Sequence, residues 1–199
     1  LEGVEKSKIT ELHNGINTDD FVVGAEESKR RIEIRSGNKV VIGFVGFCRE
    51  WHGLDEIIEL IALPENNQLF FLLVGDGPAR KSIEDNAKRL NVLSRVYVTG
   101  IVTREEIPEW LDAMDIALQP EAVDYASPLK MIEYLAKGKA IVAPKQKNIC
   151  ELLNDTKNAL LFDKDNKTGL LEAVQRLASD EALRSHVSQG AENTIKDKA

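Results

Sequence analysis

The sequence has no run of apolar residues long enough to cross a membrane. A membrane-spanning helix needs about 20 predominantly apolar residues, and the apolar runs here have the length of strands. The N-terminus also lacks the cationic and apolar regions of a signal peptide. With 199 residues, 43% of them hydrophobic and 30% charged, we expect a soluble domain that buries a full core. The chain begins at Leu1, which leaves processing or excision from a longer protein open.

Cysteine is scarce, and the two cysteines, Cys48 and Cys150, lie far apart in the sequence. Neither belongs to a metal-type spacing, so the sequence indicates no zinc site and no disulfide framework. We expect two reduced thiols in a reducing compartment, which favours a cytoplasmic location.

A basic tract is also absent. Lys and Arg number 26 against 33 Asp and Glu, which makes the formal net charge −7. Binding to the backbone of a nucleic acid needs a positive footprint, so we expect no nucleic-acid partner. A local pocket for a phosphate group stays open.

From Lys39 onward the sequence alternates short apolar runs with amphipathic segments. This alternation is typical of βα units and a parallel sheet. We therefore predict an α/β fold with a doubly wound, Rossmann-like parallel sheet of about six strands. The predicted strands are 40–45, 69–74, 96–99, 116–119, 140–143 and 159–162. The predicted helices are 54–62, 78–90, 104–113, 128–137, 149–153, 167–178 and 180–196.

Doubly wound sheets bind ligands at the carboxyl ends of their strands, so the loops after the strands form the candidate site. The first loop runs from Gly46 to Gly53 and carries Arg49 and His52, a cation and a titratable base. Such a loop suits the approach of a phosphate and is equally consistent with a plain tight connection.

The loop after the second predicted strand contains Gly75, Asp76 and Gly77. The two glycines allow a sharp reversal, and Asp76 is a candidate cap for the next helix. The loop is not a dinucleotide fingerprint, because the third glycine of that motif is replaced by Arg80.

The most informative stretch is 124–145, which joins a polar loop, a helix and a buried strand. Ser127 and Pro128 form a helix start signal, since Ser is a preferred N-cap and Pro fits the first helical position. The free backbone N–H groups between Ser127 and Lys130 form an anion site, and Glu133 lies a turn and a half beyond the cap. A phosphate at the helix start and a diol near Glu133 describe a nucleotide.

The same stretch resembles a known family. Glu133 to Ala143 reads EYLAKGKAIVA and is similar to the signature of GT-B glycosyltransferase family 4, the glycosyl transferases group 1. Asn14 to Phe21 reads NGINTDDF and resembles the crossing between the two domains of that family. Gly75 to Pro78 resembles its V-G-x-G-P segment. The resemblance covers roughly residues 13–198 as an ordered series of segments.

Three positions depart from the family pattern. Tyr125, with Asp124 beside it, stands where the family usually has the first of two Glu residues. Phe47 and His52 stand where the family places an Arg and a Lys on the donor diphosphate. Arg49 is another source of that charge, and a His at this position is charged only at mildly acid pH.

The resemblance implies the C-terminal half of a retaining glycosyltransferase, with residues 1–38 as interdomain segment and 39–199 as the donor-binding domain. It implies a nucleoside diphosphate sugar as donor, an N-terminal domain that holds the acceptor, and no cofactor or obligatory metal. Glu133 is implied to contact the donor ribose, while Asp124 and Tyr125 are weak candidates for catalysis. The predicted donor-binding residues are Gly46, Arg49, His52, Gly53, Gly75, Asp76, Gly77, Gly100, Ile101, Val102, Ser127, Pro128, Leu129, Lys130 and Glu133.

Other functions stay open at this point. A receiver domain shares the fold but needs an acidic pair after its first strand, where Phe47, Cys48 and Arg49 stand, so it is excluded. A regulatory module that binds nucleotide sugars without chemistry, a glycogen-type phosphorylase and a GT-B sugar-nucleotide epimerase are alternatives. Contact of the other half with the inner face of a membrane is also left open.

Overall fold

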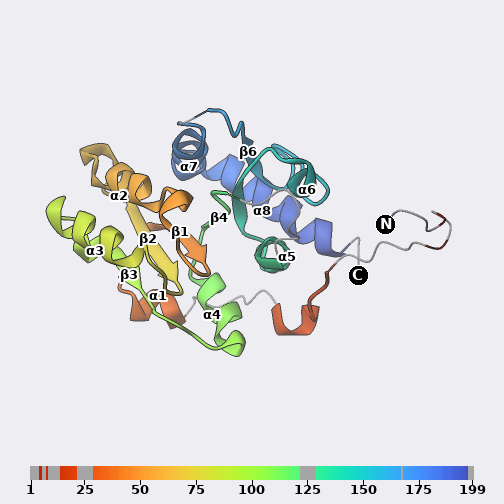
Figure 1. Ribbon diagram of the computed structural model, residues 1–199, viewed down its shortest axis with the longest axis horizontal. Helices are drawn as coiled ribbons and strands as arrows, with labels where there is room; N and C mark the ends of the chain where they lie inside the picture. Colours follow the sequence, from red (N-terminus) through yellow and green to blue (C-terminus); the bar gives the residue numbers. More distant parts are fainter. Residues whose placement is uncertain are drawn as a thin grey trace.

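The structure is a computed structural model that describes Glu5, Lys8 and residues 14–21, 29–121, 129–166 and 168–196. Its strands are β1 Val40–Val45, β2 Leu69–Val74, β3 Val96–Val98, β4 Ile116–Leu118, β5 Ala140–Pro144 and β6 Leu160–Phe162. They form one six-stranded sheet in the order β3-β2-β1-β4-β5-β6, and all neighbours are parallel (Figure 1). The predicted doubly wound α/β fold is therefore confirmed.

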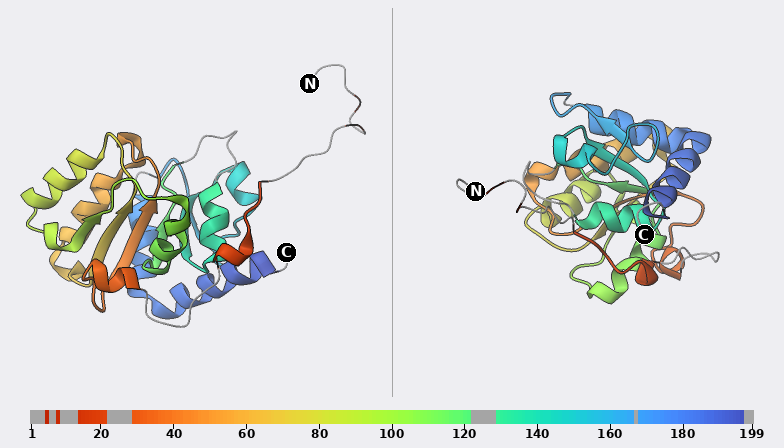
Figure 2. Two further views of the ribbon diagram at one scale, coloured as in Figure 1. Left: turned by 90° about the horizontal axis from the view of Figure 1, so that it is seen from below. Right: turned by 90° about the vertical axis from the view of Figure 1, so that its right-hand side faces the viewer.

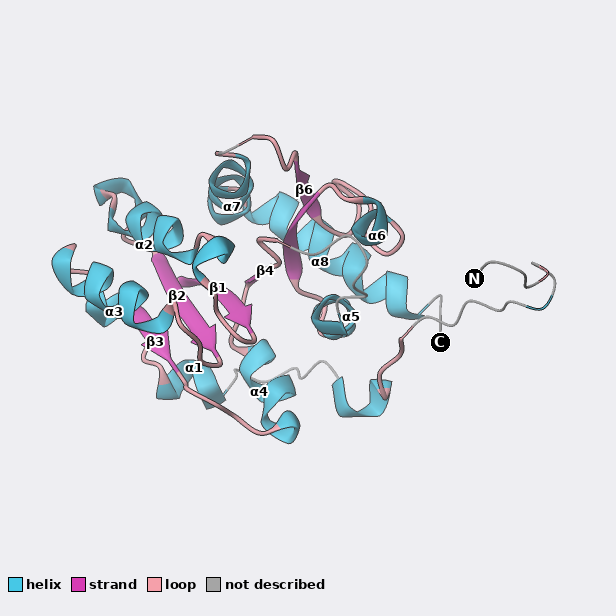
Figure 3. Ribbon diagram, in the orientation of Figure 1, coloured by secondary structure: helices cyan, strands magenta, loops and turns pink. Residues whose placement is uncertain are grey.

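Helices cover both faces of the sheet (Figure 3). Helices α2, α3 and α7 pack on one face, and α4, α5 and α6 pack on the other. Helix α8, blue in Figure 2, runs alongside α5. The helices are α1 Lys29–Glu33, α2 Leu54–Ala62, α3 Arg80–Arg89, α4 Ile107–Asp112, α5 Leu129–Ala136, α6 Lys147–Cys150, α7 Gly169–Ser179 and α8 Glu181–Lys196. Short 3-10 turns are η2 Thr18–Phe21, η3 Glu50–His52, η4 Pro64–Asn66, η5 Leu93–Arg95 and η6 Arg104–Glu106.

The apolar runs become strands because both faces of the sheet are covered. Successive side chains of a strand point to opposite faces, so β1 sends Ile42 and Phe44 into one core and Val41 and Val45 into the other. All six residues of β2 are buried for the same reason. Strands of this kind read as continuous apolar runs, which is why the sequence located them.

Some helix boundaries differ from the prediction. Helix α3 begins at Arg80, two residues after the predicted start at Pro78. Asp76 does not cap it, because its carboxylate accepts the N–H of the neighbouring Gly77 at 2.8 Å. Helix α6 begins at Lys147, two residues before the predicted start.

Side chains hold β1 against β4 at both ends of a short pairing. The two strands are in register over only two residue pairs, which begin with Ile42 and Ile116. At the amino end, an Asp115 carboxylate oxygen accepts the Val41 N–H at 2.7 Å. At the carboxyl end, the Tyr134 hydroxyl accepts the Val45 N–H at 3.1 Å and donates to the Leu118 carbonyl at 3.3 Å. Tyr134 thus spans the place where β1 and β4 separate.

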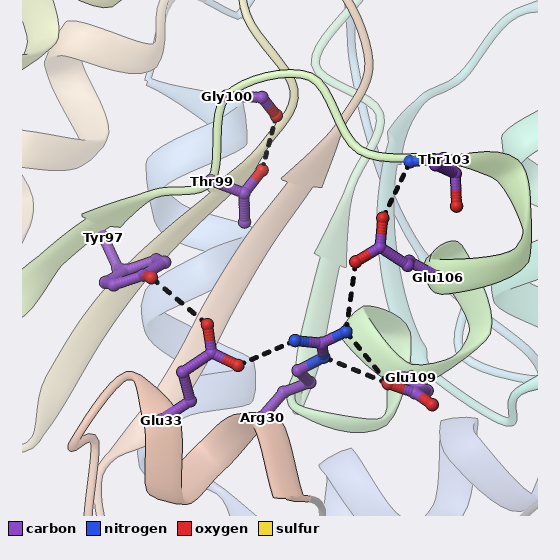
Figure 4. A network of polar contacts seen from close by, with 8 residues as sticks. All are labelled: Arg30, Glu33, Tyr97, Thr99, Gly100, Thr103, Glu106 and Glu109. Carbon is purple, nitrogen blue, oxygen red and sulfur yellow. Dashed lines mark hydrogen bonds and ion pairs between the residues drawn. The ribbon is translucent and has the colours of Figure 1, made fainter.

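The charged segment before β1 is bound to the domain more closely than the sequence suggested. The mixed charges of residues 26–39 predict a solvated helix or linker face. In the structure, however, Arg30 forms ion pairs with Glu33, Glu106 and Glu109 at 2.8, 3.3 and 3.0 Å (Figure 4). Its guanidinium carbon also lies 4.5 Å from the centroid of the Trp110 ring. Helix α1 is therefore fastened to α4 and η6, although its charge pattern alone indicated a solvated surface.

We predict that Tyr134→Phe lowers the free energy of unfolding by about 1–3 kcal/mol, because it leaves the buried Val45 N–H and Leu118 carbonyl without a partner. Urea denaturation of both proteins measures the difference. Tyr97→Phe is the matched control, since the Tyr97 hydroxyl makes a long 3.4 Å hydrogen bond to Glu33 in exposed surroundings. We expect the control to change stability by less than about 0.5 kcal/mol. Equal effects in the two variants would contradict the role given to Tyr134.

Candidate functional site

The loops after β1 and β2 fit together without space between their backbones. The Cys48 N–H donates to the Asp76 carbonyl at 2.9 Å. A methyl group at Gly75 would lie 2.2 Å from the Gly46 carbonyl oxygen, and one at Gly77 would lie 2.2 Å from the Cys48 carbonyl oxygen. Both glycines also have positive φ, 135° and 151°. Only glycine fits at these two positions, so the two loops form one fixed backbone surface.

The loop after β3 joins this surface through Thr99. The Gly75 N–H donates to the Thr99 hydroxyl at 3.1 Å. That hydroxyl donates to the Gly100 carbonyl at 2.7 Å, as Figure 4 shows. Further along, Glu106 follows Thr103 by three residues, a spacing that predicts a capping box. The Thr103 N–H donates to the Glu106 carboxylate at 2.9 Å, which confirms it. The three loops at this edge of the sheet are thus held by hydrogen bonds.

Helix α5 begins on the carboxyl side of β4 and places Lys130 and Glu133 one turn apart. Tyr134, the next residue, reaches the point where β1 and β4 separate. In this strand order that point is the topological switch point, where doubly wound sheets bind ligands. The predicted site residues Asp124, Tyr125, Ser127 and Pro128 lie outside the described residues.

Lys130 reaches back toward the first loop. Its Nζ lies 4.2 Å from the centroid of the Phe44 ring. It is also next to Gly46, where a methyl group would lie 3.4 Å from Nζ. Burial, partly offset by the nearby Glu133 carboxylate, lowers the pKa of Lys130 to about 8. Lys130 therefore brings a largely desolvated amine to the crevice.

Glu133 is half-buried, and in the part of the chain that the structure describes no residue is hydrogen-bonded or ion-paired to its carboxylate. Burial raises its pKa, and the positive charges of Arg104 and Lys130 lower it. A carboxylate in this position is available to accept hydrogen bonds from a ligand. Arg104 was not among the predicted site residues, because its place beside Glu133 arises only from the folding of η6 onto α5.

The expectation that His52 supplies a cation is not supported by its surroundings. His52 is buried, and its Nδ1 accepts the Arg49 N–H at 2.9 Å, which leaves the proton on Nε2. Burial, together with the nearby positive charge of Lys130, lowers its pKa to about 4. The ring lies against Phe44 and Trp51, with centroids 4.8 and 3.9 Å apart. At neutral pH His52 is an uncharged ring that shapes the first loop.

The remaining described residues of the prediction lie in the segments that follow β1, β2 and β3. Arg49 is exposed, with its guanidinium carbon 5.1 Å from the centroid of the Phe47 ring. Asp76 is paired with Arg80 at 3.3 Å, so its carboxylate is already engaged. Gly53 has φ 64° and joins η3 to α2, while Val102 packs against the core. Large apolar side chains are exposed at this edge, namely Phe47, Trp51, Ile101 and Leu129.

The described residues hold no group of three or more His, Cys, Asp or Glu side chains arranged for a metal ion. The helices in the same ranges are all too short or too polar to cross a bilayer. Both thiols are free, with Cys48 buried and Cys150 exposed.

Solved structures share this fold. The C-terminal domain of LpcC, a glycosyl transferase group 1 family protein from Francisella tularensis, has a TM-score of 0.79 at 22% identity, over 92% of this chain and 98% of that one. HepE from Anabaena, solved with UDP and with UDP-glucose, has TM-scores of 0.79 and 0.78 at 21% identity. The match covers 92% of this chain and 51% of HepE. The fold is that of the C-terminal domain of GT-B glycosyltransferases.

The chain belongs to the glycosyl transferases group 1 family, whose sequence profile matches residues 25–194. Among characterised relatives, 2-deoxystreptamine glucosyltransferase from Streptomyces kanamyceticus is 27% identical over 159 residues, which is 79% of this chain and 41% of that enzyme. The chain spans about half the length of the curated relatives it matches.

We predict that the His52 imidazole titrates near pH 4 and stays neutral from pH 8 to pH 5, as followed by its ring resonances in NMR. An unfolded His titrates near about 6.5. Because the folded pKa is lower, the unfolded protein binds more protons between these values, and stability is lost as pH falls from about 6.5 toward 4. His52→Gln should reduce that loss relative to the parent. A His52 midpoint near 6.5 would contradict the buried, neutral ring.

Proposed function

We propose that this chain is the donor-binding half of a glycosyltransferase. It binds a nucleoside diphosphate sugar at the carboxyl edge of the sheet, and the sugar passes to an acceptor held by an N-terminal domain. The observation that carries this proposal is the half-buried Glu133 carboxylate at the switch point between β1 and β4, which no described residue hydrogen-bonds or pairs with. Support also comes from HepE, a protein of the same fold that was solved with UDP and with UDP-glucose.

In this proposal Glu133 accepts hydrogen bonds from the two ribose hydroxyls of the donor. A half-buried carboxylate without a protein partner loses little when it exchanges water for hydroxyl donors, and charged hydrogen bonds are the stronger kind. The loop around Gly100, Ile101 and Val102 borders the base. Ile101 is 88% exposed in the described structure, so an apolar contact there would bury surface that now meets water.

The diphosphate lies over the fixed backbone of the first two loops. Gly75 and Gly77 let the two loops lie directly against each other, and Gly46 has no side chain to keep a ligand from the main chain after β1. The diphosphate gains negative charge as it leaves the sugar, and preorganised positive groups stabilise that charge. The residues proposed to line the donor site are Gly46, Arg49, His52, Gly53, Gly75, Asp76, Gly77, Gly100, Ile101, Val102, Ser127, Pro128, Leu129, Lys130 and Glu133.

The proposal assigns residues 1–38 to the interdomain segment and 39–199 to the donor domain. It includes transfer with retention at the anomeric carbon, without an obligatory metal. It also includes a cytoplasmic location, supported by the two free thiols. Contact with the inner membrane face through the other half is left open. Tyr125 and Asp124 remain the weak candidates for catalysis.

Four of the seven large apolar side chains exposed in the described part of the chain line this edge of the sheet, namely Phe47, Trp51, Ile101 and Leu129. Exposed apolar surface gathered in one place marks a face that meets a ligand or another domain. An N-terminal domain that closes over the edge would cover these side chains and exclude water from the donor.

We predict that Glu133→Ala weakens UDP binding by about 1.5–3 kcal/mol, because one charged hydrogen-bond acceptor is lost. Isothermal titration calorimetry with UDP, GDP and ADP measures the change. Glu59→Ala is the control, since Glu59 on α2 is 62% exposed and makes only a loose 3.8 Å ion pair with Arg89. If Glu133→Ala binds all three diphosphates as the parent does, the ribose contact is wrong.

We also predict that the 199-residue chain binds a sugar nucleotide and transfers nothing by itself. Transfer needs an acceptor held within about 3–3.5 Å of the anomeric carbon, with water excluded, and both depend on the other domain. Calorimetry on this chain, beside radiolabelled-donor assays of the chain and the full-length protein, tests the prediction. Turnover by the chain alone would refute the half-enzyme proposal. Full-length protein that binds donor but never transfers sugar would favour a regulatory module.

A further inference from the structure

We propose that Lys130 on α5 is the cation that holds the donor diphosphate in this chain, in place of the two first-loop cations typical of the family. The inference rests on the proposed function, because it assigns the charge within the same donor site. It is carried by the position of the Lys130 ammonium and by the absence, among the described residues, of any hydrogen bond or ion pair to it.

The first loop does not provide a buried cation. Phe47 occupies one of the two expected positions and is 58% exposed. His52 occupies the other, and its Nδ1 already accepts the Arg49 N–H. Arg49 itself is exposed and lies over the outward-facing Phe47 ring. A diphosphate held over Gly46 therefore needs its positive charge from another element.

Lys130 supplies that charge from the opposite side of the crevice. Its Nζ lies against Gly46, the first residue after β1, and over the Phe44 ring at 4.2 Å. The glycine leaves open the space where a side chain would meet the ammonium. The aromatic ring stabilises the cation by a cation–π contact that uses none of its three N–H donors. Those donors stay available for phosphate oxygens.

In the described ranges no residue accepts a hydrogen bond from Lys130 or forms an ion pair with it. Two other lysines in buried surroundings differ in this respect. Lys137 pairs with Asp112 at 2.9 Å, and Lys139 donates to the Met114 carbonyl at 3.0 Å. A desolvated charge without a partner costs stability. Such a group is expected where a ligand of opposite charge completes the site.

If Lys130 binds the diphosphate, the same helix, α5, contacts both the phosphates and the ribose. Lys130 and Glu133 are one turn apart, so they face the same side. The amine meets the phosphates and the carboxylate meets the ribose, while Tyr134 fixes the helix to β1 and β4. The distance between the two groups then selects a nucleotide over a free phosphate or a free nucleoside.

The test compares Lys130→Met with the parent chain. Two ligands are used. The first is the nucleoside diphosphate, among UDP, GDP and ADP, that binds the parent chain most tightly, and the second is the nucleoside with the same base. We expect the variant to lose about tenfold to a hundredfold in affinity for the diphosphate, and to bind the nucleoside within about twofold of the parent. Calorimetry measures the first ligand, and NMR titration at millimolar concentration measures the second.

Lys139→Met is the matched control. The Lys139 pKa is also lowered by burial, to about 8, but the residue directly precedes β5 and so lies at the opposite edge of the sheet. We expect this control to keep diphosphate affinity and to lose stability, because the Met114 carbonyl loses its donor. Thermal unfolding of Lys130→Met should show no loss of stability, because the variant removes a partly desolvated charge that no described residue pairs with.

The outcomes separate the inference from the proposed function. Unchanged diphosphate affinity in Lys130→Met would overturn the inference and leave donor binding intact. Equal losses for diphosphate and nucleoside, or an unfolded variant, would show that Lys130 supports the fold and would also overturn the inference. A parent chain that binds none of the three diphosphates would overturn the proposed function, and the inference with it.

Discussion

The site depends on one hydroxyl group, that of Tyr134, which bridges the separating ends of β1 and β4. A parallel pair of strands that diverges leaves backbone N–H and carbonyl groups without partners, and buried groups of this kind are costly. Tyr134 satisfies one of each from a helix on the other side of the crevice. Because the bond fixes α5 at the switch point, it also fixes the direction of Lys130 and Glu133. The contact that stabilises the sheet therefore also positions the two side chains that we propose to bind the ligand.

Around this bridge the walls of the crevice are made of backbone. Glycine at Gly75 and Gly77 lets the second loop lie directly on the first, and Thr99 joins the third loop to both. Hydrogen-bonded main chain loses little further freedom when a ligand arrives, which lowers the entropy cost of binding. The charge needed for an anion comes from few side chains, in a protein whose formal net charge is −7. In the proposed function, the positive charge of Lys130 beside Gly46, and not the overall charge of the protein, attracts the phosphates.

The sequence located the sheet well because strands covered on both faces are continuous apolar runs, as in Leu69–Val74. It also indicated the switch-point helix and Glu133, since start signals and helical spacing are local. It could not indicate that the Phe44 ring lies under the Lys130 ammonium, because those residues come from different elements. The neutral state of His52 has the same origin, in burial and in the charge of Lys130. The ion pairs of Arg30 could not be predicted for a similar reason, because two of its partners come from other elements and the sequence shows only a run of mixed charges.

The central claim is that the crevice between β1 and β4 binds the nucleotide through α5. A crystal structure of the 199-residue chain soaked with UDP tests it most directly. The account predicts phosphate oxygens within hydrogen-bonding distance of Lys130 Nζ, about 2.7–3.2 Å, and ribose hydroxyls at the same distance from the Glu133 carboxylate. UDP bound elsewhere on the chain, or bound in the crevice with Lys130 and Glu133 both turned away from it, would contradict the account.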